Sequence, residues 1–526
     1  MGIDSLFVLP QKLVERLFPR EYRRIFAISF ALTLLTHLYL FTNLFINHDN
    51  INGIFDNCSF GLSSGRWLLQ AATKLAGGFS SPWLDGIIAA SFLAAACTVF
   101  AAVFHIHHLL PACLLSLCMV AFPTVTSIFT YMFTSSQYIL ALLLSVLAAW
   151  LFHRQGFVGS LLGVLCIACS MGLYQAFFCL AAAVLVLIML AEVCEGRWRE
   201  DLKGFFVTGL RYLACLALGV ILYLVITKLC LCHPYTGTAL VDYQGISSMG
   251  QITVPVLLQR IKEAYRTLFL YYFRNPMYPD LFPVLVIIGL LVDAVLVGLL
   301  FWARQLYKNM ASLLQLTILL VLFPLVCNSI YLMADTKTVH NLMVYPALLP
   351  LLLPVILGNQ VTMQDLSILI KPDRQYTYTL AALLACGILL IQAAFGHQFF
   401  IIANRAYTYM DLTYESTYAY LTRLTAKIEL QEGYTPDTHV AFLGNATQPP
   451  VAPDVHVTGV LTTESAINMY SRYKFLHYFM SSSYHYASQE EVEAVKASLE
   501  FQQMPCYPAE GSIRTIDGVI AVKLGE

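Results

Sequence analysis

Charged residues are scarce in this chain of 526 residues. Asp, Glu, Lys and Arg together make up 12% of it, whereas hydrophobic residues make up 58% and the mean hydropathy is +0.69. A soluble protein usually carries about twice that charged fraction, because its surface must be covered by polar groups. The composition therefore excludes an ordinary soluble protein and predicts a membrane enzyme, transporter or channel.

An excess of charge of one sign is also missing. The 30 Lys and Arg residues nearly balance the 31 Asp and Glu residues, which leaves a formal net charge of −1. Proteins that bind nucleic acid usually present a strongly basic surface. We therefore expect no nucleic acid among the partners.

The 14 cysteines lack the pattern of a disulfide framework. Most of them fall in apolar runs, where cysteine packs as a small hydrophobic residue. Cys230 and Cys232 are followed by His233, but no second pair of ligands is near them in the sequence. A zinc-type site needs such a second pair, so we do not expect one here.

Long apolar runs account for the high hydropathy. Six of them are each long enough to cross a hydrocarbon core of about 30 Å as an α-helix: 25–46, 87–104, 205–229, 281–301, 313–333 and 378–402. The first is too long for a cleavable signal peptide, and we expect it to be retained. Two neighbouring runs, at 157–172 and 174–192, could instead form one long kinked element. We expect about eleven spans, at 25–46, 84–108, 111–133, 137–153, 157–172, 174–192, 205–229, 281–302, 311–333, 342–358 and 378–402.

Basic residues set the expected orientation. A cluster of five precedes the first span and should remain in the cytoplasm: Lys12, Arg16, Arg20, Arg23 and Arg24. If the N-terminus is cytoplasmic, the compact basic clusters at 197–203, 304–308 and 371–374 all fall on the cytoplasmic side as well. Asp293 lies within an expected span, where an ionisable group is costly. Asp293 is either functional or close enough to the cytoplasmic end of the span to reach Arg304, and we expect the second.

The longest segments between and after the spans then face the other side. They are a first loop at 47–83, a second at 230–280, a short one at 334–341 and a polar tail. We divide the chain into a transmembrane domain, residues 1–402, and a soluble extracytoplasmic α/β domain, residues 403–526. Two segments, 66–76 and 254–273, have amphipathic patterns that predict helices lying along the membrane surface.

Local patterns in the tail predict its elements. Helices are expected at 407–432, at 464–480 and from 488 to about 501, and a strand at 439–443. Ser488 and Glu491 have the spacing of a capping box. Asp517-Gly518 lies between two short β-prone runs, 513–516 and 519–523, which is a strong hairpin signal.

The first loop holds the residues best suited to chemistry. It reads Asn-His-Asp-Asn at 47–50, has a second acid at Asp56, and continues to Gly-Arg-Trp at 65–67. Asp49 is placed to act as a general base that takes a proton from an acceptor hydroxyl. Arg66 is suited to bind a phosphate. The equally weighted alternative is structural: Asp49 caps a helix, and Arg66 anchors an interfacial helix among lipid headgroups.

These residues resemble the bacterial serotype-converting glucosyltransferases that modify O-antigen. The resemblance rests on an Asp just after the first span, followed by an aromatic-containing stretch that ends in Gly-Arg-Trp at 65–67. Met-Gly-Leu-Tyr-Gln-Ala at 171–176 is similar to a second feature of that family. The family often has paired acids after the first span, whereas here Asp49 stands between His48 and Asn50. A single carboxylate puts a metal in doubt, so a divalent cation is left open as a cofactor and no metal ligand is assigned.

The resemblance implies a GT-C membrane glycosyltransferase of the bacterial cytoplasmic membrane. Such enzymes take a sugar, here expected to be glucose, from a polyprenyl-phosphate donor at the outer face and pass it to a glycan acceptor. Asp49 would be the base, with Asp56 as alternative. Cations would stabilise the leaving phosphate, and polar side chains would bind the sugars: Arg66, Arg260 and Arg266 for the phosphate, and His48, Tyr174, Gln175, Asp335 and His340 for the substrates.

Two alternatives remain at this stage. Tyr174 and Gln175 could simply join two helices through a hydrogen bond. The whole chain could be a polytopic transporter or a flippase of polyprenyl-linked glycans, but a transporter usually shows internal repeats and broken mid-membrane helices. Neither feature is evident in the sequence, and the polar residues gather at the ends of spans.

Overall fold

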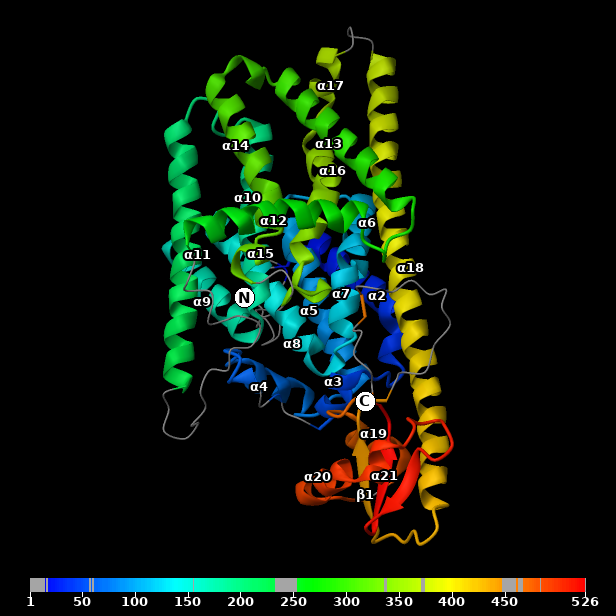
Figure 1. Ribbon diagram of the computed structural model, residues 1–526. Helices are drawn as coiled ribbons and strands as arrows, with labels where there is room; N and C mark the ends of the chain where they lie inside the picture. Colours follow the sequence, from blue (N-terminus) through cyan, green and yellow to red (C-terminus); the bar gives the residue numbers. More distant parts are fainter. Residues whose placement is uncertain are drawn as a thin grey trace, which may run out of the picture.

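The fold is a helical bundle with a small sheet at one end (Figure 1). The computed structural model describes Glu15, residues 18–55, Cys58, and residues 61–154, 156–231, 253–334, 338–369, 374–446, 460–461, 467–482 and 484–525. The chain is a membrane protein by its apolar helices, eight of which within these residues are long and apolar enough to cross a bilayer. They are α2 (Arg20–Phe41), α5 (Pro82–Val103), α8 (Met132–His153), η3 (Gln175–Phe177) with α10 (Phe178–Glu195), α11 (Leu202–Leu231), α13 (Phe282–Ala303), α14 (Met310–Cys327) and α18 (Arg374–Glu429).

The remaining expected spans are bent or short. Helices α6 (Leu109–Ala121) and α7 (Pro123–Phe129) would be a ninth span, but they meet at an angle of 48°. The bend falls at Phe122, which is extended because a residue before proline disfavours the helical conformation. Helix α9 (Phe157–Leu173) and the segment formed by η8 (Tyr345–Leu348) and α16 (Leu349–Gln360) are apolar but shorter. All the predicted segments are therefore helical, while a count of about eleven crossings stays a prediction.

The pair at 157–172 and 174–192 is two helices rather than one kinked element. Tyr174 separates them with an extended backbone, φ −157° and ψ 111°. The break places Tyr174, which is buried, and Gln175, which is half-buried, at the end of α9 rather than within a continuous helix. This local interruption shapes the candidate site described below.

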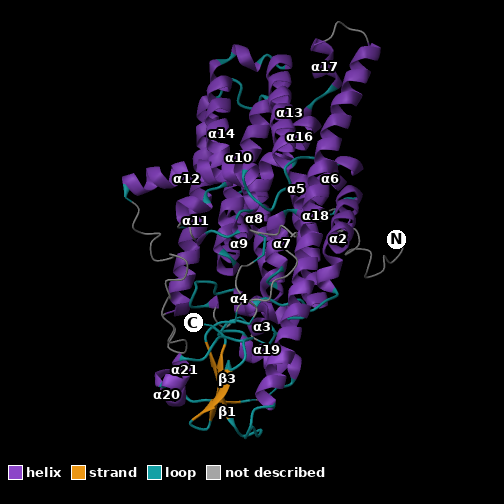
Figure 2. Cartoon of the chain, turned by 45° about the vertical axis from the view of Figure 1, so that its right-hand side comes forward, coloured by secondary structure: helices purple, strands orange, loops and turns teal. Residues whose placement is uncertain are grey.

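Helix α12 (Val254–Phe273) lies across the bundle, at a large angle to α11 and α13 (Figures 1 and 2). It buries Ala264, Leu268 and Tyr272 along one stripe, which the half-buried Arg260 continues, and it leaves Lys262 and Arg266 exposed. This arrangement agrees with the amphipathic pattern of the sequence. The other predicted surface helix is shorter than expected, since Arg66 and Trp67 belong to the turn before α4 (Leu69–Thr73) and η2 (Lys74–Ala76).

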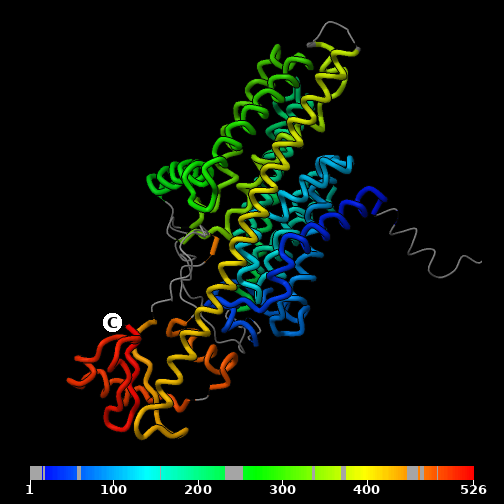
Figure 3. The backbone as a smooth tube through the Cα atoms, turned by 90° about the vertical axis from the view of Figure 1, so that its right-hand side faces the viewer, coloured from blue at the N-terminus to red at the C-terminus, as the bar shows by residue number. Residues whose placement is uncertain are grey.

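Helix α18 links the bundle to the C-terminal sheet without a break. Its 56 residues pass through positions 402 and 403, and at about 1.5 Å per residue they span roughly 84 Å. Figure 3 shows the helix running from the end beside α17 (Met363–Leu369) to the sheet. The tail helix predicted from residue 407 is thus the continuation of the last apolar helix.

The C-terminal sheet has the strand order β2-β1-β4-β3. Strand β1 (His439–Leu443) pairs in parallel with β2 (His485–Tyr486) and β4 (Val519–Lys523). Strand β3 (Ile513–Ile516) pairs antiparallel with β4, so the predicted hairpin is confirmed. Asp517 and Gly518 both have positive φ, as the tight hairpin turn requires.

Among the described residues that follow α18, three helices accompany the sheet: α19 (Arg472–Met480), α20 (Gln489–Ala497) and α21 (Leu499–Gln502). The capping box of Ser488 and Glu491 is confirmed at the start of α20. The single helix expected there is divided in two, because Ser498 is extended and caps α21. Helix α19 begins later than the predicted residue 464, and part of that predicted helix, residues 464–466, lies outside the described residues.

The C-terminal sheet and its helices pack against the first loop. Ile46 and Ile51 share one buried hydrophobic cluster with residues of α18 and α19, among them Leu421 and Phe475. Lys474 Nζ donates a hydrogen bond to the backbone oxygen of Asn52, at 3.2 Å. The tail is therefore in direct contact with the segment that carries Asp49.

The expected pairing of Asp293 with Arg304 is wrong. Arg304 instead donates two hydrogen bonds to the carboxylate of Asp365, at 3.3 and 3.1 Å, at the start of α17. Asp293 is buried within α13, and its Oδ1 has no hydrogen-bond partner among the described residues. Arg304 follows Asp293 by eleven positions and lies just after the last residue of α13. There it meets the carboxylate of Asp365 instead.

Candidate functional site: the first loop and the Tyr-Gln break

Asp49 lies on a short helix, α3 (His48–Gly53), that follows α2 directly. Asn47 caps this helix, since its Oδ1 accepts hydrogen bonds from the backbone N–H groups of Asp49 and Asn50, at 3.0 and 2.7 Å. The structural alternative that Asp49 itself caps a helix is therefore wrong. Its carboxylate is 37% exposed and lies 3.5 Å from His48 Nε2.

Two asparagines fix α3 to the neighbouring helix α7. The side-chain amides of Asn47 and Asn50 both donate to the backbone oxygen of Thr130, each at 2.7 Å, just after the last residue of α7. Gly53 ends α3 against the ring of Phe133, where an added Cβ would come within 2.3 Å. The turn that carries Asp49 is thus held from both ends, and the sequence places small or amide-bearing residues where the contacts need them.

Arg66 lies in a cluster of aromatic and amide side chains. It is only 7% exposed, and its Nη1 donates to the Tyr138 hydroxyl at 2.8 Å. Its Nε donates to Gln175 Oε1 at 3.4 Å, and its guanidinium lies 5.0 Å from the centre of the Tyr174 ring. The rings of Tyr138 and Tyr174 are stacked at 4.2 Å. Cation–π contact and charged hydrogen bonds together offset the burial of this charge.

Gln175 connects the two motifs of the sequence. Its Nε2 donates to the backbone oxygen of Ser64 at 2.8 Å and to the Tyr223 hydroxyl at 3.2 Å. The backbone N–H of Leu68 donates to the oxygen of Gly172 at 2.9 Å. The Gly-Arg-Trp segment and the Tyr-Gln break are therefore parts of one unit, which we call the Arg66 cluster: Ser64, Arg66, Tyr138, Tyr174, Gln175 and Tyr223.

Helix α7 also binds the segment that contains His340. Asn341 Nδ2 donates to Ser127 Oγ at 2.7 Å, and Thr124 Oγ1 donates to the Asn341 backbone oxygen at 2.9 Å. His340 precedes η7 (Asn341–Met343) and is exposed. One buried helix therefore supports both the Asp49 turn at its end and the His340 segment along its side.

The remaining predicted residues divide into three groups. Arg260 Nη1 donates to the backbone oxygen of Leu332 at 2.9 Å, which places it beside the segment that leads toward His340. Arg266 is 63% exposed and pairs with Glu263 of its own helix at 3.4 Å. It belongs to neither the Asp49 turn nor the Arg66 cluster. Asp56 and Asp335 lie outside the described residues.

Sequence reasoning missed Tyr138 and Tyr223, which complete the Arg66 cluster from α8 and α11. The signal available was a tyrosine within an otherwise apolar span, which is weak on its own. It also missed Asp85 at the start of α5, whose Oδ2 accepts from Ser80 Oγ and the Ser81 N–H, at 3.1 and 3.0 Å. Asp85 closes the first loop and is buried, so its position indicates a structural role.

A metal would need ligands that converge. Within the described ranges, no three His, Cys, Asp or Glu side chains gather in such an arrangement. His48 and Asp49 together offer one imidazole and one carboxylate, which is fewer protein ligands than a dedicated cation site usually has.

Comparison with known proteins gives one family. The family model described as glucosyl transferase GtrII matches residues 38–351, which is more than half of the chain and includes both the Asp49 turn and the Arg66 cluster. No curated protein and no solved structure matches the chain. The family identification confirms the resemblance found in the sequence and supports a glycosyltransferase rather than a transporter. The chain therefore belongs to the GtrII family of serotype-converting glucosyltransferases.

Proposed function

We propose that this protein transfers a sugar, expected to be glucose, from a polyprenyl-phosphate donor to a glycan at the extracytoplasmic face of the bacterial cytoplasmic membrane. The observation that carries the proposal is the Asp49 carboxylate, which is partly exposed on a turn fixed by Asn47 and Asn50. A general base must be both accessible to substrate and held in place. Asp49 combines these two properties.

In this proposal, Asp49 takes the proton of an acceptor hydroxyl as its oxygen attacks the anomeric carbon. The new glycosidic bond forms while the bond from that carbon to the donor phosphate breaks, and the phosphate leaves with the bonding electrons. One displacement of this kind inverts the anomeric configuration. His48, 3.5 Å from the carboxylate, is placed to orient Asp49 or a sugar hydroxyl.

Cations near the leaving phosphate lower the barrier, because negative charge develops there. Arg66 keeps the predicted phosphate-binding role, with Tyr174 and Gln175 shaping the sugar side of the site. Arg260 and His340 belong to the elements gathered around α7 and α12 and are proposed to contact the donor from that side. Arg266 is proposed only as a surface cation that attracts the lipid-linked phosphate. The roles predicted for Asp56 and Asp335 stay predictions.

The experiment is Asp49→Asn in full-length protein, with transfer of labelled sugar from the polyprenyl-phosphate donor measured in membranes. Loss of the base should lower kcat by about 10² to 10⁴ while KM changes little. Asp437→Asn is the matched control, because Asp437 is 95% exposed in the C-terminal domain and should leave the rate unchanged. An Asp49→Asn enzyme that transfers sugar at the normal rate would show that Asp49 is not the base.

A further inference from the structure

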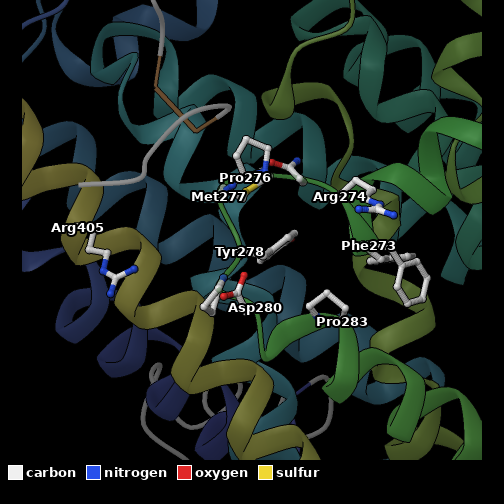
Figure 4. A pocket seen from close by; sticks show the side chains of 11 residues that line it. Phe273, Arg274, Pro276, Met277, Tyr278, Asp280, Pro283 and Arg405 are labelled. Carbon is white, nitrogen blue, oxygen red and sulfur yellow. Dashed lines mark hydrogen bonds between the residues drawn. The ribbon is translucent and has the colours of Figure 1, made fainter. Parts of the chain in front are cut away.

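A cavity of about 480 Å³ lies apart from the Asp49 turn and the Arg66 cluster. It opens where α12 ends and α13 begins, and α18 forms its other side (Figure 4). Its lining is residues 272–280 together with Pro283 and Arg405.

Two arginines stand on opposite sides of this cavity. Arg274 follows the last residue of α12 and Arg405 projects from α18, with Tyr278 and Asp280 between them (Figure 4). Both arginines are exposed. Among the described residues, neither guanidinium forms a hydrogen bond or an ion pair with the protein. One carboxylate, Asp280, reduces the positive charge of the cavity but does not cancel it. Such a cavity favours an anion.

The wall of the cavity between the two arginines is packed against the bundle. The ring of Tyr278, which lines the cavity, stacks at 3.7 Å on the ring of Phe282 behind it, and both residues are buried. Asn275 Oδ1 accepts a hydrogen bond from the backbone N–H of Met277 at 3.2 Å, which fixes the turn between the helices. The arginines therefore flank a preformed surface that does not need to fold on binding.

The position of the cavity indicates which anion it meets. Helix α12 is amphipathic and lies across the bundle, while α13 begins at Phe282, is long and apolar enough to cross a bilayer and carries a single charged residue, Asp293. The junction of an interfacial helix with a membrane-crossing helix lies at the surface of the bilayer. Lipid phosphates occupy that level.

We propose that this cavity binds the phosphate-bearing head group of a lipid, held by Arg274 and Arg405 from two sides. The site is separate from the residues assigned to sugar transfer and does not depend on that chemistry. The same phosphate chemistry could be presented by a polyprenyl phosphate, by an anionic bilayer lipid or by free phosphate, so the experiment compares all three.

The test measures binding to full-length protein in phosphatidylcholine nanodiscs, without acceptor. The probes are farnesyl phosphate, its uncharged analogue farnesol, inorganic phosphate, and nanodiscs that contain phosphatidylglycerol. The double variant Arg274→Gln/Arg405→Gln is compared with Arg24→Gln, a substitution of an exposed arginine near the start of α2. Because all three side chains are exposed, the variants should keep the melting temperature of the native protein.

Native protein should bind at least one phosphate-bearing probe at this cavity in addition to any donor held by Arg66. The double variant should bind it at the cavity at least about tenfold more weakly, whereas Arg66→Gln should leave this binding unchanged. Arg24→Gln should bind it normally, and Asp49→Asn should bind it normally as well, which separates this site from the proposed base. The probe whose binding is lost identifies the source of the phosphate. Equal binding by the double variant and the native protein overturns the proposal, as does equal binding of farnesol and farnesyl phosphate, or no binding of any phosphate probe.

Discussion

The indole of Trp67 lies directly against Gly172, where an added Cβ would come within 2.5 Å of the ring. This contact joins the first loop to the end of α9, beside the hydrogen bond from Leu68 to the Gly172 oxygen. Only glycine permits so close an approach. The two motifs that identify the family are thus packed against each other as well as hydrogen-bonded.

Gly172→Ala should therefore damage both stability and activity. The new methyl group forces the Trp67 ring to move, which costs about 1–3 kcal/mol for an overpacked site, and the shift displaces Arg66. Thermal unfolding in detergent and transfer rates check this result. The matched control is Gly387→Ala in α18, where no atom lies within 4 Å of the added carbon. An alanine at 172 that leaves both quantities at native values would contradict the packing.

Tyr138→Phe removes the hydroxyl that accepts the hydrogen bond of Arg66 while keeping the stacked ring. We expect a loss of about 1–3 kcal/mol of stability, because a charged donor loses its partner in a buried site. Transfer should also slow, since Arg66 is held less firmly. Tyr376→Phe, at an exposed tyrosine near the start of α18, should change neither the melting temperature nor the rate. Identical behaviour of the two variants would rule out a role for the Tyr138 hydroxyl.

Asn47 performs two tasks that substitution can separate. Asn47→Ala removes both the helix cap and the hydrogen bond to Thr130, and it should cost about 0.5–2 kcal/mol for the cap alone. Asn47→Asp keeps a capping oxygen but loses the amide donor and places a carboxylate against a carbonyl. If the anchor to α7 positions Asp49, kcat should fall in both variants while KM changes little. A normal kcat in Asn47→Asp would mean that the cap alone is sufficient.

The Arg304–Asp365 pair predicts a dependence of stability on pH. Burial raises the pKa of the Asp365 carboxyl, but the hydrogen bonds from Arg304 and Thr362 outweigh it and bring that pKa below its ordinary value of 3.8. A lowered pKa in the folded state stabilises the protein above the ordinary pKa, and this contribution disappears as the pH falls through the lowered value. Asp365→Asn should therefore melt at a lower temperature than native protein at pH 7.

The difference should shrink as the pH is brought below 3.8. Melting curves recorded across that range provide the measurement. Asp437→Asn serves again as the control, because its side chain is 95% exposed and its 3.9 Å contact with His485 is screened by solvent, so any pH-dependent difference should be much smaller. A gap between Asp365→Asn and native protein that stays constant with pH would show that the pair does not act through the charge of Asp365.

Local features of the fold could be predicted from the sequence, and contacts between distant segments could not. Apolar length located the membrane-length helices of the described residues, and the amphipathic pattern located α12. The Asp517-Gly518 hairpin and the Ser488 capping box depend on neighbouring residues only. Arg66 and Gln175 are 109 positions apart, so their hydrogen bond is decided by how α8, α9 and α11 pack. The partner of Arg304 was mistaken for the same reason. Asp49 was identified correctly as lying just after the first helix, but its cap by Asn47 and the anchor to Thr130 follow from the three-dimensional position of α7.

Because α18 is one unbroken helix, a change in its tilt within the membrane moves the C-terminal sheet at its far end. Over roughly 84 Å, a change of about 5° in helix tilt displaces the far end by about 7 Å. The domain at that end rests on α3 through Ile51 and Lys474. Bilayer thickness influences the tilt of spanning helices. A thicker or thinner membrane would therefore change how closely the C-terminal sheet packs against the turn that carries Asp49.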